Sequence, residues 1–220
     1  MNAEPKKTAE HETIHRRISK ALLFGELVPG QAVTLHGLAD MIGSGVMPVR
    51  DTVRQLTSAG ALRRLGNRRI EVPRLNESEL DELAFARCAI EPKLVEMAVQ
   101  MHHTRLLDDL KGIDLELDKA IAEGKVEGYL LHNFRFHFHL YASAESSILY
   151  HMAEALWLRA GPSLRIVYGR YGTANLPDMH DETLSAVRAG DAKRAAEAIK
   201  ADIMQGMELI KTSLIEAPVT

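Results

Sequence analysis

Residues 130–140, LLHNFRFHFHL, hold the densest group of side chains in this chain that could do chemistry. Three of them are the imidazoles of His132, His137 and His139, and Asn133 precedes His137 by four residues. On a helix, residues four apart lie on one face. Because a helix in a protein core does not normally gather imidazoles, this stretch is either a partly solvated helix face or a binding site.

A second group of side chains suits contact with a polyanion. Residues 1–75 carry 12 Lys and Arg against 7 Asp and Glu, a balance of +5. Residues 76–220 carry 15 against 23, a balance of −8, and the two sum to the net charge of −3. This asymmetry favours a small basic module that meets a polyanion, joined to an acidic body that does not. Chance clustering of charges is the alternative.

The composition excludes several classes of protein. The chain has 220 residues, 46% of them hydrophobic, which supports a real core in one large or two small domains. No stretch approaches the roughly eighteen apolar residues of a membrane span, and MNAEPKKTAEHET lacks the apolar segment of a secretion signal. The single cysteine, Cys88, excludes an internal disulfide framework and a Cys-rich zinc site. We expect a cytoplasmic protein with no membrane partner.

The elements that position the arginines follow from apolar periodicity and from the residues that break it. Pro48 falls in the first turn of a helix whose Arg50 and Arg54 share one face. A GNR turn then separates two short basic segments that resemble strands. Three helices followed by a basic hairpin form the winged helix-turn-helix plan. The helices are predicted over residues 11–27, 35–42 and 47–60, and the hairpin over 61–75.

From residue 76 onward the sequence shows only helical periodicity. Its breaks predict about six helices and leave no strong strand candidate. The fold expected is therefore mainly α, with a winged helix-turn-helix domain over residues 1–75 and an all-helical bundle over residues 76–220. The breaks lie near residues 102–104, 124–126, 143–146, 172–177 and 189–191.

Two sets of motifs resemble a known family. FGELVPGQAVTLHGLADMIGSGVMPVRDTVRQLTSAGAL, residues 24–62, is similar to the N-terminal domain of GntR-family transcription regulators. ELAFARCAIEP, FHFHLYASAESSIL and MHDETLSAVRAGDAKRAAEAI resemble the FCD ligand-binding domain that follows in one branch, and six helices are similar to its shorter VanR-type group. The resemblance covers about residues 12–210. It implies a ligand-responsive homodimer, expected to be a repressor, that binds near-palindromic operator DNA.

The resemblance also identifies where this chain departs from the family in its DNA contacts. The family usually has Ser-Arg-Thr before PVR, where this chain has Gly45, Val46 and Met47. Valine cannot replace an arginine that reads guanine, a contact worth about 1–3 kcal/mol of discrimination. Either the operator differs from the usual one or DNA binding is weaker, and the surviving arginines favour the first. The expected DNA-binding residues are Arg50, Arg54, Arg68 and Arg69.

A metal site is likewise implied by the resemblance. The family carries Asp-x-x-x-His on the helix with the FH signature and two later histidines; these positions are Asn133, His137, His180 and Asp202 here. One carboxylate remains, moved to another helix. Such ligands suit Zn, Ni, Mn or Fe and leave coordination positions open. Asparagine is a poor ligand, so a lost site is the alternative. The remaining nearby histidines, His132, His139 and His151, are interpreted as surface or packing residues.

In related domains the metal and nearby basic groups hold a small organic acid. Arg87 matches the arginine of the family's RxxxE motif and could bind the carboxylate of that effector. The alternative is a structural salt bridge to Glu91, one turn further on.

Two other classes compete with an effector-responsive regulator. One is a helical metalloenzyme acting on a small carboxylate, because His and Asp ligands with open positions can activate water. The other is a regulator with a purely structural metal. The sequence has no nucleophile motif, phosphate loop or second carboxylate placed as a general base, and a basic GNRR wing has no use in an enzyme. We therefore expect a regulator rather than an enzyme.

Overall fold

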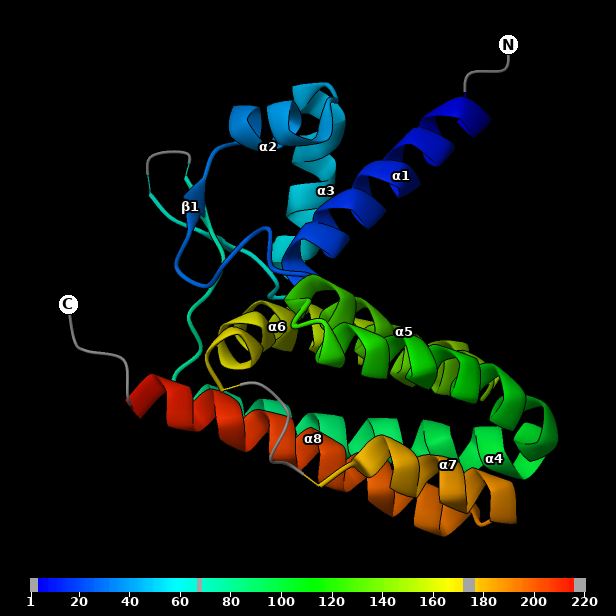
Figure 1. Cartoon of the computed structure of the whole chain (residues 1–220). Helices are drawn as coiled ribbons and strands as arrows, with labels where there is room; N and C mark the ends of the chain where they lie inside the picture. Colours follow the sequence, from blue (N-terminus) through cyan, green and yellow to red (C-terminus); the bar gives the residue numbers. More distant parts are fainter. Residues whose placement is uncertain (1–3, 67–68, 172–176, 216–220) are drawn as a thin grey trace. The chain divides into compact units, whose positions relative to one another are not determined.

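The computed structural model describes residues 4–66, 69–171 and 177–215 (Figure 1). The chain folds into two compact units. The first consists of Met1–Leu75 together with Trp157–Ser163, and the second of Asn76–Leu156 and Leu164–Thr220. The chain therefore changes unit at Leu75, and one short segment from the middle of a later helix belongs to the first unit.

The first unit is a winged helix-turn-helix, as the sequence predicts. Its helices are α1 (Glu4–Leu23), α2 (Leu35–Ile42) and α3 (Val46–Ser58). A small antiparallel sheet has the strand order β1-β3-β2, in which Ile70 pairs with both Val33 and Arg64. The strands are β1 (Ala32–Val33), β2 (Arg63–Arg64) and β3 (Ile70–Glu71). The bounds differ from the prediction: α1 begins before residue 11 and ends at Leu23, and α3 ends at Ser58. Strand β1 adds a third strand.

Local signals in the sequence set the ends of α2 and α3. The Thr34 side chain caps α2 by accepting a hydrogen bond from the Gly37 amide at 3.0 Å, and Gly43 ends this helix with φ 71°. Gly45 precedes α3 without a side-chain cap, and Pro48 occupies its first turn. The apolar face of α3 is fully buried at Val49 and Val53. The opposite face is therefore the one presented to solvent.

The second unit is entirely helical among the residues described. Its helices are α4 (Glu77–Ala122), α5 (Val126–Ala142), α6 (Ser147–Tyr171), α7 (Met179–Ala189) and α8 (Ala192–Ile215). Asn76 and Glu79 form a capping box at the start of α4, and non-helical dihedral angles at His102 break this long helix in two. The unit thus has six helical segments in the described chain. Their breaks confirm those predicted, although residues 172–176 of the fourth break lie outside the described residues.

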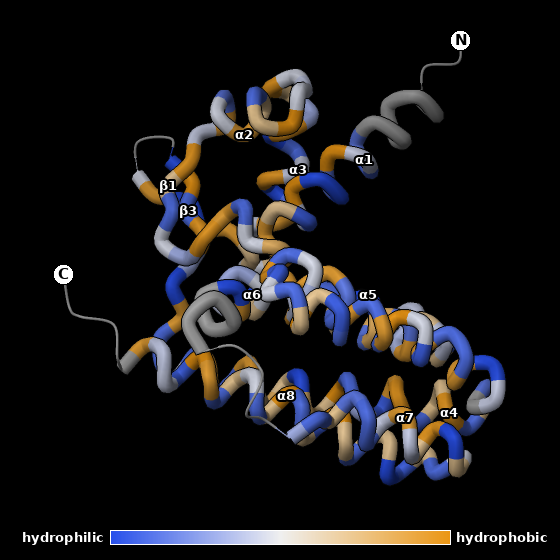
Figure 2. Tube along the Cα trace, in the orientation of Figure 1, coloured by the Kyte–Doolittle hydropathy of each residue, from blue (hydrophilic) through white to orange (hydrophobic). Residues whose placement is uncertain are grey.

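Three helices of this unit, α5, α7 and α8, pack against α4. In Figure 1, α5 lies on one side of α4, while α7 and α8 lie on the other. Hydrophobic and hydrophilic residues alternate around each helix in Figure 2, as expected for helices with one buried face. None of the described helices is both long enough and apolar enough to cross a membrane. The core nevertheless contains buried polar side chains, which need partners. They are Arg87, Glu91, Asn133, His137, His180, Thr183 and Ser213.

Candidate metal centre and nucleic-acid interface

Three of the four expected metal ligands converge. One ligand atom from each of His137, His180 and Asp202 lies within 4.8 Å of the others. His137 is fully buried on α5, His180 is buried on α7, and Asp202 is partly buried on α8. Asn133 is also buried, one turn before His137 and on the same face of α5. Packing of helices distant in sequence therefore brings the donor atoms together.

The orientation of His137 is set by a buried chain of hydrogen bonds. Arg87 donates from Nε to Glu91 Oε1 at 2.7 Å and from Nη2 to Glu91 Oε2 at 3.1 Å. Tyr141 donates its hydroxyl proton to Glu91 Oε2 at 2.6 Å. The Tyr141 oxygen lies 3.0 Å from His137 Nδ1. Because the only hydroxyl proton is used on Glu91, the oxygen accepts from Nδ1–H, and the tautomer of His137 is fixed.

This tautomer leaves the lone pair of His137 Nε2 facing a carboxylate. Nε2 lies 3.1 Å from Asp202 Oδ2, so two electron-rich atoms meet unless a cation is present. Burial lowers the pKa of His137 in spite of the opposing attraction of Asp202, which disfavours a proton as that cation. The donor set consequently fits a metal cation.

His180 has the surroundings usual for a metal-bound imidazole. Its Nδ1 lies 3.4 Å from Asp114 Oδ1, and its ring stacks on Phe136 with centroids 3.9 Å apart. Nε2 is buried and has no hydrogen-bond partner among the residues described. Burial disfavours the charged ring, but Asp114 and Asp202 outweigh it and raise the pKa of His180. Histidine ligands commonly have a carboxylate on one ring nitrogen and the metal on the other.

The sequence did not point to Asp114 or Tyr141. Asp114 lies on α4 and meets His180 only through helix packing, so no spacing signal could identify it. Tyr141 follows His137 by four residues, which places both on one helix face, and this spacing could have indicated their contact. Arg87 forms the buried pair with Glu91 that was the structural alternative for this residue.

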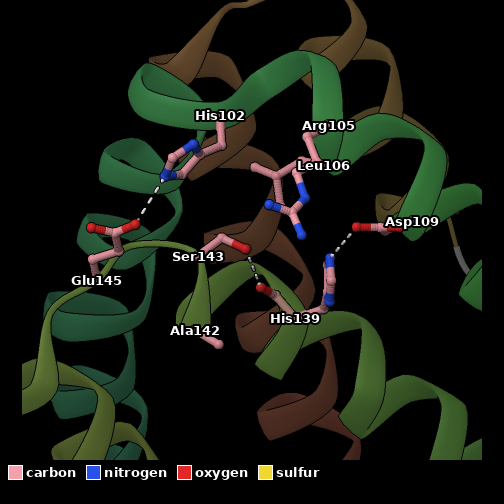
Figure 3. A pocket seen from close by; sticks show the side chains of 8 residues that line it. All are labelled: His102, Arg105, Leu106, Asp109, His139, Ala142, Ser143 and Glu145. Atoms are coloured by element: carbon pink, nitrogen blue, oxygen red, sulfur yellow. Dashed lines mark hydrogen bonds and ion pairs between the residues drawn. The ribbon is translucent and has the colours of Figure 1, made fainter.

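His139 takes no part in the group of three ligands. Its Nε2 lies 3.2 Å from Asp109 Oδ2, and His102 Nε2 lies 3.3 Å from Glu145 Oε1. Both pairs line a separate pocket into which Arg105 also points (Figure 3). His139 therefore points elsewhere than His137, as expected. His132, the remaining histidine of the opening stretch, is partly buried.

The expected DNA-binding residues lie on the exposed face of α3 and in the wing. Arg50 and Arg54 are both exposed one turn apart, and Arg54 lies 4.0 Å from Asp51. Arg50 also lines a pocket with Arg64 and Arg69, and Arg64 was not among the four residues predicted to contact DNA. Arg68 lies outside the described residues. The arginines thus form a basic surface with no acidic side chain lining that pocket among the residues described.

Comparison with known families shows which kind of protein has these two sites. The chain matches the family "Bacterial regulatory proteins, gntR family" over residues 10–72 and the FCD domain over residues 82–204. The chain belongs to the GntR family of transcription regulators, in its FCD-domain branch. The DNA-binding domain and the helical domain of this GntR regulator thus correspond to the two motif sets recognised in the sequence.

Individual relatives agree with this membership. The chain is 30% identical over 196 residues to the HTH-type transcriptional regulator McbR of Escherichia coli K12, covering 87% of this chain and 88% of McbR. It is 22% identical over 220 residues to the HTH-type transcriptional repressor GlaR of the same organism, covering 91% and 95%. The solved structure of E. coli McbR/YncC superposes with a TM-score of 0.85 at 25% identity, covering 93% and 98%. These relatives are regulators, which sets aside the metalloenzyme alternative.

A more distant solved structure has the same fold. A GntR regulator from Rhodococcus sp. RHA1 superposes with a TM-score of 0.72 at 16% identity, covering 93% of this chain and 99% of that one. At this identity the likeness concerns the fold alone. The function of the helical domain is therefore argued from the residues of this chain and not from the Rhodococcus structure.

Proposed function

We propose that this GntR regulator binds a divalent metal through His137, His180 and Asp202. Asn133 stands on the same face of α5 as a fourth donor. The observation that carries the proposal is the His137 Nε2 lone pair, which the hydrogen-bond chain holds 3.1 Å from Asp202 Oδ2 in a buried place. Nitrogen and oxygen donors of this kind suit Zn, Ni, Mn or Fe.

The chain's own residues prepare this site in two ways. Tyr141 and Asp114 each engage the Nδ1 side of one histidine, which leaves both Nε2 atoms for the metal. Asp202 contributes the negative charge that offsets part of the charge of a divalent cation. Because the donors come from α5, α7 and α8, a bound metal would tie three helices to one another and stabilise the domain.

The proposed effector is a small organic acid whose carboxylate binds beside the metal. A bound metal would supply a Lewis-acidic position for it. Arg87 already donates two hydrogen bonds to Glu91, so its guanidinium serves first to hold Glu91 and, through it, Tyr141. Its Nη1 also lies 3.9 Å from Met207 Sδ, so an effector carboxylate would have to compete with contacts that Arg87 already makes.

DNA binding and effector sensing are proposed to reside in different parts of the chain. Residues 1–75 would bind one operator half-site each in a homodimer, and residues 76–220 would sense the ligand. Ligand binding in the helical domain would change the spacing of the two DNA-binding domains, which couples the two sites. Repression is the proposed outcome, and it is supported by the name of the relative GlaR, a transcriptional repressor.

Metal analysis combined with thermal unfolding tests the metal site. The purified protein should carry about one metal ion per chain, and a chelator should lower its melting temperature. His137→Ala and His180→Ala should abolish the chelator effect, whereas His139→Ala, whose imidazole pairs with Asp109, should retain it. A wild-type protein whose melting temperature responds neither to chelator nor to added Zn, Ni, Mn or Fe would refute the proposal.

The structural-metal alternative needs a different measurement. If the metal serves an effector, small di- and tricarboxylates added to the metal-loaded protein should change its affinity for operator DNA. If the metal is purely structural, these acids should leave DNA affinity unchanged while the chelator still lowers the melting temperature. Native mass spectrometry of the same sample reports whether the protein is the proposed homodimer.

A further inference from the structure

The exposed face of α3 begins with an apolar side chain. Met47 is 63% exposed, one of the most exposed large hydrophobic residues described. Val46 beside it is partly buried and packs against the core of its unit. These two residues occupy positions where the family usually has arginine and threonine. Only Met47 of the two therefore projects its side chain mainly into solvent.

Met47 lies at the N-terminal end of the exposed face of α3 that carries the arginines. Arg50 follows it by three residues and Arg54 by seven, so all three lie on one side of α3, and all three are exposed. Residues at the N-terminal end of a recognition helix are the ones that contact base edges in the major groove. Arg54 lies farther along the helix. Met47 is thus the apolar side chain placed where bases are read.

The chemistry of the major groove offers one partner for such a side chain. Adenine, guanine and cytosine present nitrogen and oxygen donors and acceptors there, whereas thymine adds a methyl group at C5. A thioether makes no strong hydrogen bond, but it gains by removing apolar surface from water. We infer that Met47 reads the C5 methyl group of one thymine in each operator half-site. The inference rests on the docking of α3 in the major groove.

The expected size of this contact follows from the loss of one methyl group. Burying a methyl or methylene group is worth about 0.8 kcal/mol, which corresponds to about a fourfold change in affinity. Deoxyuridine keeps both hydrogen-bonding groups of thymine and lacks only the C5 methyl group. Replacing a contacted thymine by deoxyuridine should therefore weaken binding about fourfold per half-site, with no change in hydrogen bonding.

The experiment uses the full chain. Duplexes preferred by the wild type are selected from a randomised pool, and each thymine of the selected site is then replaced singly by deoxyuridine. Affinities are measured by fluorescence anisotropy for the wild type, Met47→Ala and Met41→Ala. Met41 is the matched control, because it is an exposed methionine at 38% but lies on α2. Equal melting temperatures of the three proteins show that all are folded.

At one thymine per half-site, deoxyuridine should weaken the wild type and Met41→Ala about fourfold and leave Met47→Ala unchanged. Equal deoxyuridine effects in the wild type and Met47→Ala at every thymine would overturn the inference. So would selected half-sites that contain no thymine. If the wild type selects no duplex, the docking of α3 in the groove fails together with the inference, a result distinct from loss of the methyl effect alone.

Discussion

Replacing Tyr141 by phenylalanine tests the hydrogen-bond chain that orients His137. Tyr141 is completely buried, and its hydroxyl is joined to Glu91 Oε2 at 2.6 Å and to His137 Nδ1 at 3.0 Å. Phenylalanine keeps the ring and removes both hydrogen bonds. The Nδ1–H of His137 is then left buried without its acceptor, which should lower the free energy of unfolding of the metal-free protein by about 1–3 kcal/mol.

The same change should weaken metal binding. Loss of a hydrogen-bond partner of a metal-bound histidine typically costs about 10–100-fold in affinity. At a metal concentration roughly a hundredfold above the wild-type Kd, the wild type gains about 2.7 kcal/mol of stability. The variant should gain only about 1.4 kcal/mol for a tenfold loss and about 0.4 kcal/mol for a hundredfold loss. The gain in unfolding free energy on adding metal therefore distinguishes two roles of Tyr141. A residue that positions His137 changes this gain, whereas a merely structural residue does not.

The assay is denaturant unfolding with and without Zn, alongside competition with a chromophoric chelator. Tyr150→Phe is the matched control, since Tyr150 lies on α6 with its ring 5.5 Å from Phe138 and outside the Glu91–His137 chain. It should leave the metal increment at its wild-type value. If Tyr141→Phe binds Zn as tightly as the wild type while His137→Ala does not, the tautomer of His137 is not set by Tyr141, and the reasoning is refuted.

Three further changes test other parts of the molecule. Asp202→His should preserve binding of Zn and Ni but weaken Mn more strongly, because it removes the one carboxylate of the ligand set; unchanged Mn affinity in the same competition assay would contradict this. Arg54→Ala should weaken operator binding and reduce the slope of log affinity against log salt concentration by about one. If isolated residues 76–220 bound the operator as tightly as the full chain, the assignment of DNA binding to residues 1–75 would be wrong. Val46→Arg should change base preference at one position per half-site, and identical selected motifs would exclude position 46 as a determinant.

Much of the fold followed from local signals in the sequence. The helices of the second unit end where glycine or a loss of periodicity predicts, for example at Gly190, which ends α7 with φ 68°. The start of α1 at Glu4 was not predicted, because EPKKTAE contains no apolar stripe from which periodicity could be read. Strand β1 was missed for a related reason, since a two-residue strand carries no alternation.

The candidate metal ligands were predicted from the resemblance of motifs, whereas the residues that surround them were not predicted. A helical sequence specifies which residues share a face of one helix, as with Asn133 and His137 on α5 or Arg87 and Glu91 on α4. It does not specify which faces of different helices meet. Asp114 could not be assigned to His180 on this basis, because α4 and α7 come together only by packing.

The sequence by itself determined the class of this protein, a basic winged helix-turn-helix followed by an acidic helical domain. The apolar periodicity, the charge of each half and the order of the motifs were sufficient to predict both domains. The tertiary structure alone decided which of two neighbouring apolar residues, Val46 or Met47, reaches solvent, because their burial depends on the core that α3 packs against. It also decided that His137 Nε2 faces Asp202. That orientation depends on hydrogen bonds between α4 and α5, and side chains distant in sequence form such bonds only after the helices have packed.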